Sequence, residues 1–197
     1  MTDTHDARPT VPVRERNRNR AILVFIVVVF FGSAIVAGAL RFSGWRPAGM
    51  KNHGELLQPP GDLRQVVPRL VDGGEYRWNP VERTWRILVA PPASCTDACV
   101  TLSQDLDKVW RLFGHNADHV NILWVGEPPE GALRNRVWNV VQPDPALSAQ
   151  LPGVGEGGAQ GAPVYVVDPN GFVILRYAPG FDPGHLRTDM ARLLKLK

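Results

Sequence analysis

Residues 85–102 read Trp85-Arg-Ile-Leu-Val-Ala-Pro-Pro-Ala-Ser-Cys95-Thr-Asp-Ala-Cys99-Val-Thr-Leu102. The apolar residues 87–90 predict a buried strand, which must end at the two prolines that follow. A helix is expected just beyond, with Thr96 or Asp97 as its N-cap. The only two cysteines of the chain are therefore predicted at the carboxyl end of a strand, where an open α/β sheet places its binding and catalytic groups.

The spacing of Cys95 and Cys99 limits how the two thiols can meet. Side chains four residues apart on a regular helix have Cβ atoms about 5–6 Å apart, whereas a disulfide needs roughly 3.5–4.5 Å. A bonded pair, or a pair that holds one metal ion, thus requires Cys95 in the loop and Cys99 in the first helical turn. A disulfide that closes so short a loop constrains the unfolded chain little. We therefore favour a redox or metal role, with a structural disulfide as the alternative.

Charge is concentrated at the N-terminus of the chain. The formal net charge is +3, and residues 1–20 hold five Arg against three acidic side chains. The remaining 17 basic side chains are balanced by 16 acidic ones, so no basic surface for nucleic acid is indicated. The sequence also contains no phosphate-binding loop, no paired catalytic carboxylates and no Ser/His/Asp pattern.

Residues 21–40 (AILVFIVVVFFGSAIVAGAL) predict a transmembrane helix. They carry no charge and are long enough to cross a bilayer core of about 30 Å. The Arg-rich residues 1–20 predict a cytoplasmic tail, because positive charge favours the inner side. A signal peptide cleaved near Ala37-Gly38-Ala39 is the alternative, although the apolar run is long for one. We expect a single-pass protein of the inner (plasma) membrane with a periplasmic C-terminal domain.

The rest of the chain alternates strands and helices. Residues 41–69 are predicted as a linker, and residues 70–197 as one α/β domain. A hairpin is expected between 70–78 and 83–89, and the glycine-rich residues 153–161 are expected to form a flexible loop. Further strands are expected at 120–125, 137–141, 163–168 and 172–177, and further helices at 102–113, from Asp144 to about Leu151, and from Asp182 onward.

This order of elements looks like a thioredoxin fold, with a cysteine pair after the first central strand and a closing hairpin and helix. Within that fold the Cys95-x-x-x-Cys99 spacing resembles the Sco/SenC family of cytochrome c oxidase assembly proteins, whereas ordinary thioredoxins have Cys-x-x-Cys. The single N-terminal anchor and the hairpin turn Asp168-Pro-Asn-Gly171 resemble Sco proteins too. The resemblance covers residues 70–197, and Ala98 departs from it where the family has a second proline.

One departure concerns copper. Sco proteins place a copper-binding His shortly before the hairpin turn, and counting back from Asp168 gives Gln160 at the matching position. Cu(I) prefers soft thiolate and imidazole ligands, so an amide is a poor replacement. We expect weak copper binding through Cys95 and Cys99, unless a third ligand comes from one of the histidines that we otherwise place on the surface, His115, His119 or His185.

Pro163 stands directly before a predicted strand, where thioredoxin-like oxidoreductases resemble one another in carrying a cis-proline beside the disulfide. An ordinary trans proline is the alternative. The resemblance implies a thiol–disulfide role in oxidase biogenesis, in which Cys95 attacks, Cys99 resolves the mixed disulfide and Pro163 holds the substrate strand. It implies cytochrome oxidase subunits or a copper carrier as partners. A non-catalytic assembly module with a structural disulfide and a weak Cu(I) chaperone are the alternatives.

Overall fold

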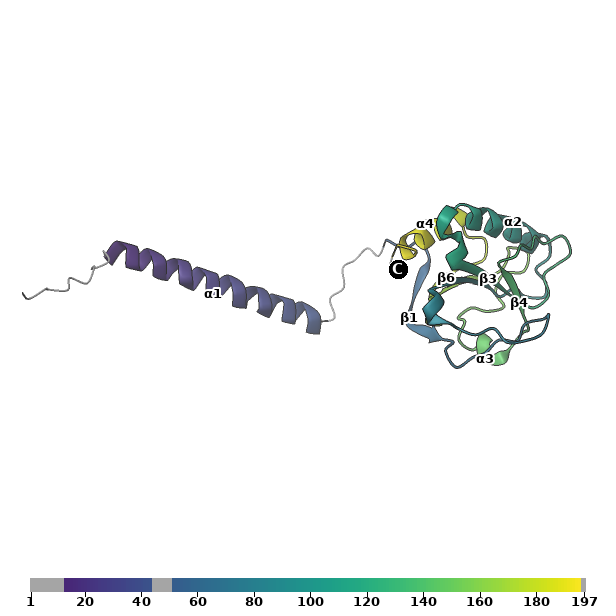
Figure 1. Ribbon diagram of the computed structural model, residues 1–197, viewed down its shortest axis with the longest axis horizontal. Coiled ribbons are helices and arrows are strands. Elements are labelled where there is room, and N and C mark those ends of the chain that lie inside the picture. The colour runs from purple at the N-terminus through teal and green to yellow at the C-terminus, as the bar shows by residue number, and fades with distance from the viewer. Residues whose placement is uncertain (1–12, 44–50, 196–197) are drawn as a thin grey trace, which may run out of the picture. The chain divides into compact units, whose positions relative to one another are not determined.

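The structure is a computed structural model that describes residues 13–43 and 51–195 (Figure 1). It divides into two compact units, residues 1–50 and residues 51–197. In the first unit, helix α1 spans Val13–Phe42. Its segment Asn17–Phe42 is apolar enough to cross a membrane, and its 26 residues extend about 39 Å. The apolar helix predicted before the domain is therefore present.

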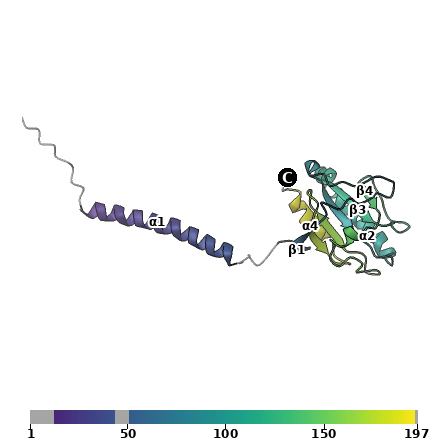
Figure 2. The ribbon, with the colours of Figure 1, turned by 90° about the horizontal axis from the view of Figure 1, so that it is seen from below.

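The second unit is built on one six-stranded sheet. The strand order is β1-β6-β5-β2-β3-β4, so β1 and β4 form the edges, which Figure 2 shows at opposite sides of the domain. β2 pairs in parallel with β3, and β3 with β4, whereas β5, β6 and β1 pair in an antiparallel manner. The strands are β1 Glu55–Asp62, β2 Trp85–Val89, β3 Val120–Val125, β4 Trp138–Val141, β5 Val164–Val167 and β6 Phe172–Tyr177.

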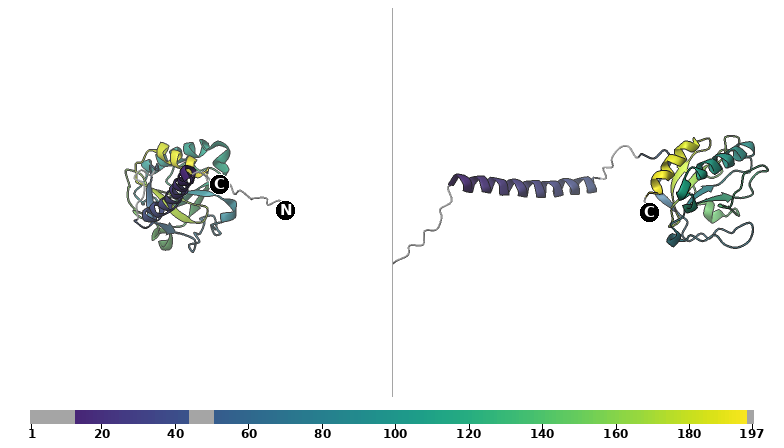
Figure 3. Two further views of the ribbon diagram at one scale, coloured as in Figure 1. Left: turned by 90° about the vertical axis from the view of Figure 1, so that its left-hand side faces the viewer. Right: turned by 45° about the horizontal axis from the view of Figure 1, so that its top comes forward.

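Both faces of the sheet are covered, and the alternation of side chains along the strands divides the core in two. Ile87 and Val89 join the cluster with helices α2 (Asp97–Arg111) and α4 (Pro183–Leu193), which lie together on one face (Figure 3). Leu88 points to the other face, which is covered by the short helix α3 (Pro145–Ser148) and by loops. Two 3₁₀ helices, η1 (Pro80–Glu82) and η2 (Gly114–His119), precede β2 and β3.

Residues 41–69 were predicted as a linker, and this is wrong for β1. That strand adds to the sheet beside β6, with Glu55 opposite Arg176 and a register shift between Leu56 and Gly61. Its sequence ELLQPPGD shows no alternating pattern. Two prolines remove backbone donors, which only an edge strand or a bulge tolerates. The strand was missed because its residues show no alternating pattern and its place in the sheet comes from pairing with β6.

The predicted hairpin between residues 70–78 and 83–89 is also wrong. β2 is buried along its whole length and pairs with β3 and β5, which leaves no edge for a hairpin partner. The segment instead turns back on itself at Gly73 and Gly74, both of which have positive φ. It forms isolated bridges from Arg69 to Glu75 and from Leu70 to Val141, so that it borders β4.

Candidate functional site

Cys95 and Cys99 form a disulfide at the point where β2 passes into α2. Their Cα atoms are 5.5 Å apart. Cys95 lies in the loop before the helix and Cys99 in its first turn, with Thr96 at the N-cap position, as the spacing predicted. The amide of Cys95 donates to the carbonyl of Pro92 (3.0 Å), and the amide of Cys99 donates to that of Thr96 (2.9 Å). Local hydrogen bonds thus fix both sides of the disulfide.

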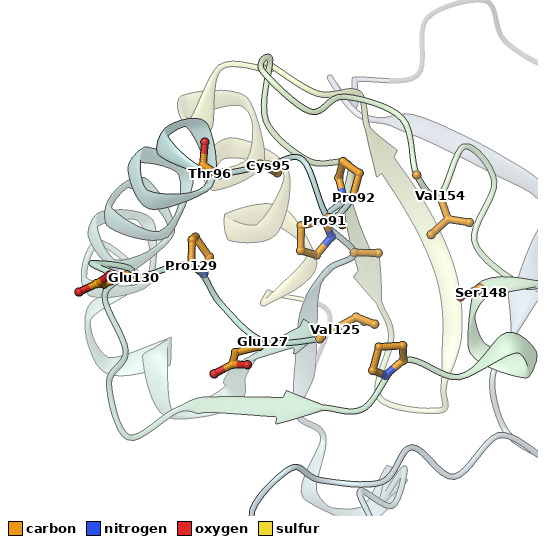
Figure 4. Close-up of a pocket in the computed structure, with 15 residues that line it drawn as sticks. Pro91, Pro92, Cys95, Thr96, Val125, Glu127, Pro129, Glu130, Ser148 and Val154 are labelled. Atoms are coloured by element: carbon orange, nitrogen blue, oxygen red, sulfur yellow. The ribbon is translucent and has the colours of Figure 1, made fainter.

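The two sulfur-bearing residues differ in their access to solvent. Cys95 is 6% exposed and Cys99 is fully buried. Cys95 lines a cavity of about 770 Å³ at the carboxyl ends of β2 and β3, whereas Cys99 does not (Figure 4). A thiol partner could therefore approach Cys95 first. The cavity is lined by Ala90, Pro91, Pro92, Ala93, Cys95, Thr96, Val125, Gly126, Glu127, Pro129, Glu130, Pro143, Ser148, Val154 and Gly155.

A smaller cavity of about 210 Å³ borders the other side of the same helical turn. Ala98, next to Cys99, lines it from α2, and Gln160 and Ala162 line it from the segment before β5. Gln160, which stands where the Sco resemblance expects a copper ligand, thus shares a cavity with Ala98, the neighbour of Cys99.

The glycine-rich segment 153–161 was predicted as a flexible loop, but an ion pair and a packing contact hold it against the rest of the domain. Glu156 forms an ion pair with Arg176 of β6, whose guanidinium also binds Glu55 at 3.2 Å. A Cβ atom on Gly158 would lie 2.9 Å from Oγ of Ser94, so the backbone of this segment packs against the residue that precedes Cys95. The segment forms part of the wall around the disulfide.

The peptide bond before Pro163 is trans, which was the alternative to the cis-proline of thioredoxin-like oxidoreductases. Gln58–Pro59 is the one cis peptide bond in residues 13–43 and 51–195. Pro163 is buried and its carbonyl accepts from the amide of Ala90 (3.5 Å), so it lies beside the end of β2. It lines neither cavity. Its role in holding a substrate strand stays a prediction.

Among the described residues, the histidines form no metal-binding group with the cysteines. His115 and His119 lie in η2, before β3, and β3 runs parallel to β2, so they are at the end of the sheet opposite the disulfide. His185 stacks on His53 with ring centroids 4.2 Å apart. Within the described part of the chain, no three His, Cys, Asp or Glu side chains form a group that could hold a metal ion.

Sequence reasoning missed a buried carboxylate, that of Asp189 in α4. It is 2% exposed and accepts from the backbone amides of His53 (2.7 Å) and Gly54 (3.0 Å) and from the hydroxyl of Tyr177 (2.8 Å). Burial alone would raise the pKa of Asp189, but the hydrogen bonds together lower it. A signal was present, because Asp189 interrupts the apolar face between Leu186 and Met190.

Comparison with known proteins identifies the fold. Residues 85–197 match the family model described as transmembrane-like, thioredoxin-like, C-terminal domain. The search of curated proteins found no match. Among solved structures, apo Sco1 of Thermus thermophilus is similar with a TM-score of 0.51 at 18% identity, over 77% of this chain and 100% of that one.

Two further structures show less similarity. A SCO1/SenC family lipoprotein of Bacillus anthracis has a TM-score of 0.49 at 14% identity, over 71% of this chain and 98% of that chain. Peroxiredoxin Q of Xanthomonas campestris has a TM-score of 0.48 at 16% identity, over 74% and 98%. The family model confirms the predicted thioredoxin-like fold, and a Sco protein is among the solved structures that share this fold.

Proposed function

Because the chain belongs to the family of transmembrane-like, thioredoxin-like C-terminal domains, we propose that it is a membrane-anchored thiol–disulfide protein that serves cytochrome c oxidase assembly. The observation that carries the thiol–disulfide role is the placement of Cys95 at a cavity of about 770 Å³ while Cys99 is fully buried. The link to the oxidase rests on the Cys-x-x-x-Cys motif and the hairpin turn, which resemble Sco proteins. The partner is then an oxidase subunit or a copper carrier whose cysteines must be reduced before they bind copper.

The exchange we propose moves two electrons from this chain to the partner. The thiolate of reduced Cys95 attacks one sulfur of the partner's disulfide, and the partner's other sulfur leaves as a thiolate. Cys99, as thiolate, then attacks the Cys95 sulfur, which releases the partner's second thiolate and forms the Cys95–Cys99 disulfide. A second dithiol protein must reduce that disulfide again before the next round.

Trapping the mixed disulfide tests this proposal. In the Cys99→Ser variant the resolving thiol is missing, so partners should accumulate as covalent complexes with Cys95 that reducing agent releases. The matched control is Cys95→Ser, which keeps one thiol of the pair but places it in the buried position and should trap nothing. Non-reducing electrophoresis of membranes followed by mass spectrometry would identify an oxidase subunit or a copper carrier.

The alternative is an assembly module with a passive disulfide, which the low exposure of both cysteines favours. In that case neither variant would trap a partner, and Cys95→Ser would leave the amount of assembled oxidase unchanged. Both results together would overturn the exchange proposal. A trapped partner outside the oxidase pathway would keep the exchange and remove the oxidase assignment.

A further inference from the structure

The charged side chains at the cavity beside Cys95 are all acidic. Among the described residues, Glu127 and Glu130 are the only acidic or basic side chains that line it. Both lie on the loop after β3 and are exposed, and neither has an ion-pair partner among the described residues. Figure 4 shows them on one side of the opening, with Val154 and Ser148 on the other. Two unpaired carboxylates at the rim favour a cationic ligand.

The remaining wall is mostly apolar and stiff. Four of the lining residues are prolines, whose rings fix φ and whose nitrogens donate no hydrogen bond: Pro91, Pro92, Pro129 and Pro143. Val125 and Val154 add aliphatic surface. A volume of about 770 Å³ lies in the range of preformed ligand sites. The cavity therefore fits a few apolar side chains of an extended segment, and not a highly polar ligand.

We propose that this cavity docks an extended segment of the partner protein in which a cysteine is flanked by an apolar residue and by Lys or Arg. The proposal rests on the thiol–disulfide function above and names the class of substrate. The basic side chain would pair with Glu127 and Glu130, and the apolar side chain would lie on the prolines. In this docked position the partner's sulfur lies against Cys95. The two-electron exchange described above can then proceed.

The test measures how charge beside the target cysteine changes the rate of exchange. The reduced full-length chain in detergent micelles is mixed with the peptides Arg-Leu-Cys-Leu-Arg, Gln-Leu-Cys-Leu-Gln and Glu-Leu-Cys-Leu-Glu, each as its mixed disulfide with 2-mercaptoethanol. Each turnover releases the peptide thiol and 2-mercaptoethanol and forms the Cys95–Cys99 disulfide. We expect the Arg peptide to react about threefold to tenfold faster than the Glu peptide at low ionic strength, and salt to reduce that ratio.

Matched variants locate the effect. In Glu127→Gln/Glu130→Gln the ratio of the Arg to the Glu peptide should fall to about one, because the shape of the rim is kept and its charge is removed. The control Glu82→Gln removes a carboxylate from η1, which precedes β2 and so lies at the other end of that strand; it should leave the ratio unchanged. Equal rates for all three peptides with the wild-type chain would overturn the docking proposal.

A binding measurement separates this proposal from the exchange function. Fluorescent Ser analogues of the three peptides cannot exchange, so their anisotropy reports docking alone. If no disulfide is reduced but the Arg analogue binds best and loses its advantage in Glu127→Gln/Glu130→Gln, the docking site stands and the exchange function falls. If hydroxyethyl disulfide is reduced but the analogues bind without charge preference, docking falls and exchange stands. Dimerisation of the chain through this cavity, seen as a dimer in sedimentation that the double variant dissociates, would also overturn it.

Discussion

At the scale of single residues, Gln160 stands at the position where the Sco resemblance expects a copper ligand. It lines the smaller cavity together with Ala98, the neighbour of Cys99. An amide is a weak ligand for Cu(I), which leaves the two sulfurs of the reduced pair as the soft donors on this turn. We therefore propose that any copper carried by the chain is weakly held cargo.

The substitution Gln160→His tests this assignment. An imidazole at this position would add a third soft ligand, so the reduced variant should retain Cu(I) more strongly than the wild-type chain against a competing chelator. An increase of about tenfold, equivalent to about 1.4 kcal/mol, is the smallest effect that supports it. Gln104→His on the exposed side of α2 is the matched control and should change nothing. An unchanged affinity in Gln160→His would show that this segment cannot bring its side chain to the sulfurs.

The positions of the cysteines were predictable from sequence, whereas the contacts of Asp189 were not. Cys95 and Cys99 are close in sequence, so bond lengths and helix geometry alone place one outside the helix and the other in its first turn. The donors to Asp189 come from His53, Gly54 and Tyr177, which are far from it in the chain. A local pattern does not record which distant donors will meet one carboxylate.

At the scale of elements, Asp189 fastens the start of the domain to α4. Because the hydrogen bonds lower its pKa in the folded state, the folded chain binds fewer protons here than the unfolded chain. This contribution to stability is therefore complete above the ordinary pKa of 3.8 and is lost as the pH falls through that value toward the folded pKa.

The substitution Asp189→Asn should destabilise the domain by about 1.5–3 kcal/mol at pH 7, because it weakens several hydrogen bonds to a charged acceptor. The loss should be smaller near pH 3, below the ordinary pKa of 3.8, because part of the stability that the lowered pKa of Asp189 contributes is already lost there. Urea unfolding followed by tryptophan fluorescence at both pH values would measure it. Asp182→Asn on the same helix is the control, since Asn is an equally good N-cap and the exposed site should tolerate it. An equal loss at both pH values would show that the charge of Asp189 contributes nothing.

The elements whose own residues show an apolar run or a helix cap were predicted well. β3 at Val120–Val125 and α4, opened by Asp182 and Pro183, follow from an apolar run and from a cap with proline at N1. β1 carries two prolines and depends on β6 for its hydrogen bonds. Its place in the sheet is a property of the tertiary fold, and no pattern in residues 55–62 indicates it.

At the scale of the whole molecule, the first unit contains one helix long and apolar enough to span a membrane, and the second a thioredoxin-like domain. The excess of Arg before the apolar run favours a cytoplasmic N-terminus and a periplasmic domain. We predict that alkaline phosphatase fused after Lys197 is active in cells, because it folds only after export, and that the same fusion at Arg20 is inactive. Activity of the second fusion alone would reverse the orientation and remove the oxidising compartment that the exchange function needs.

The measurement that tests the exchange function most directly is the thiol state of Cys95 and Cys99 in the membrane of living cells. Acid quenching followed by alkylation with a mass-adding maleimide separates the free thiols from the disulfide on a gel. We predict that both forms are populated, and that the reduced form increases when the proposed copper-site partner is deleted, because its electrons then have no acceptor. A pair that is fully oxidised in every strain, with or without the partner, would contradict the proposal and leave a passive structural disulfide.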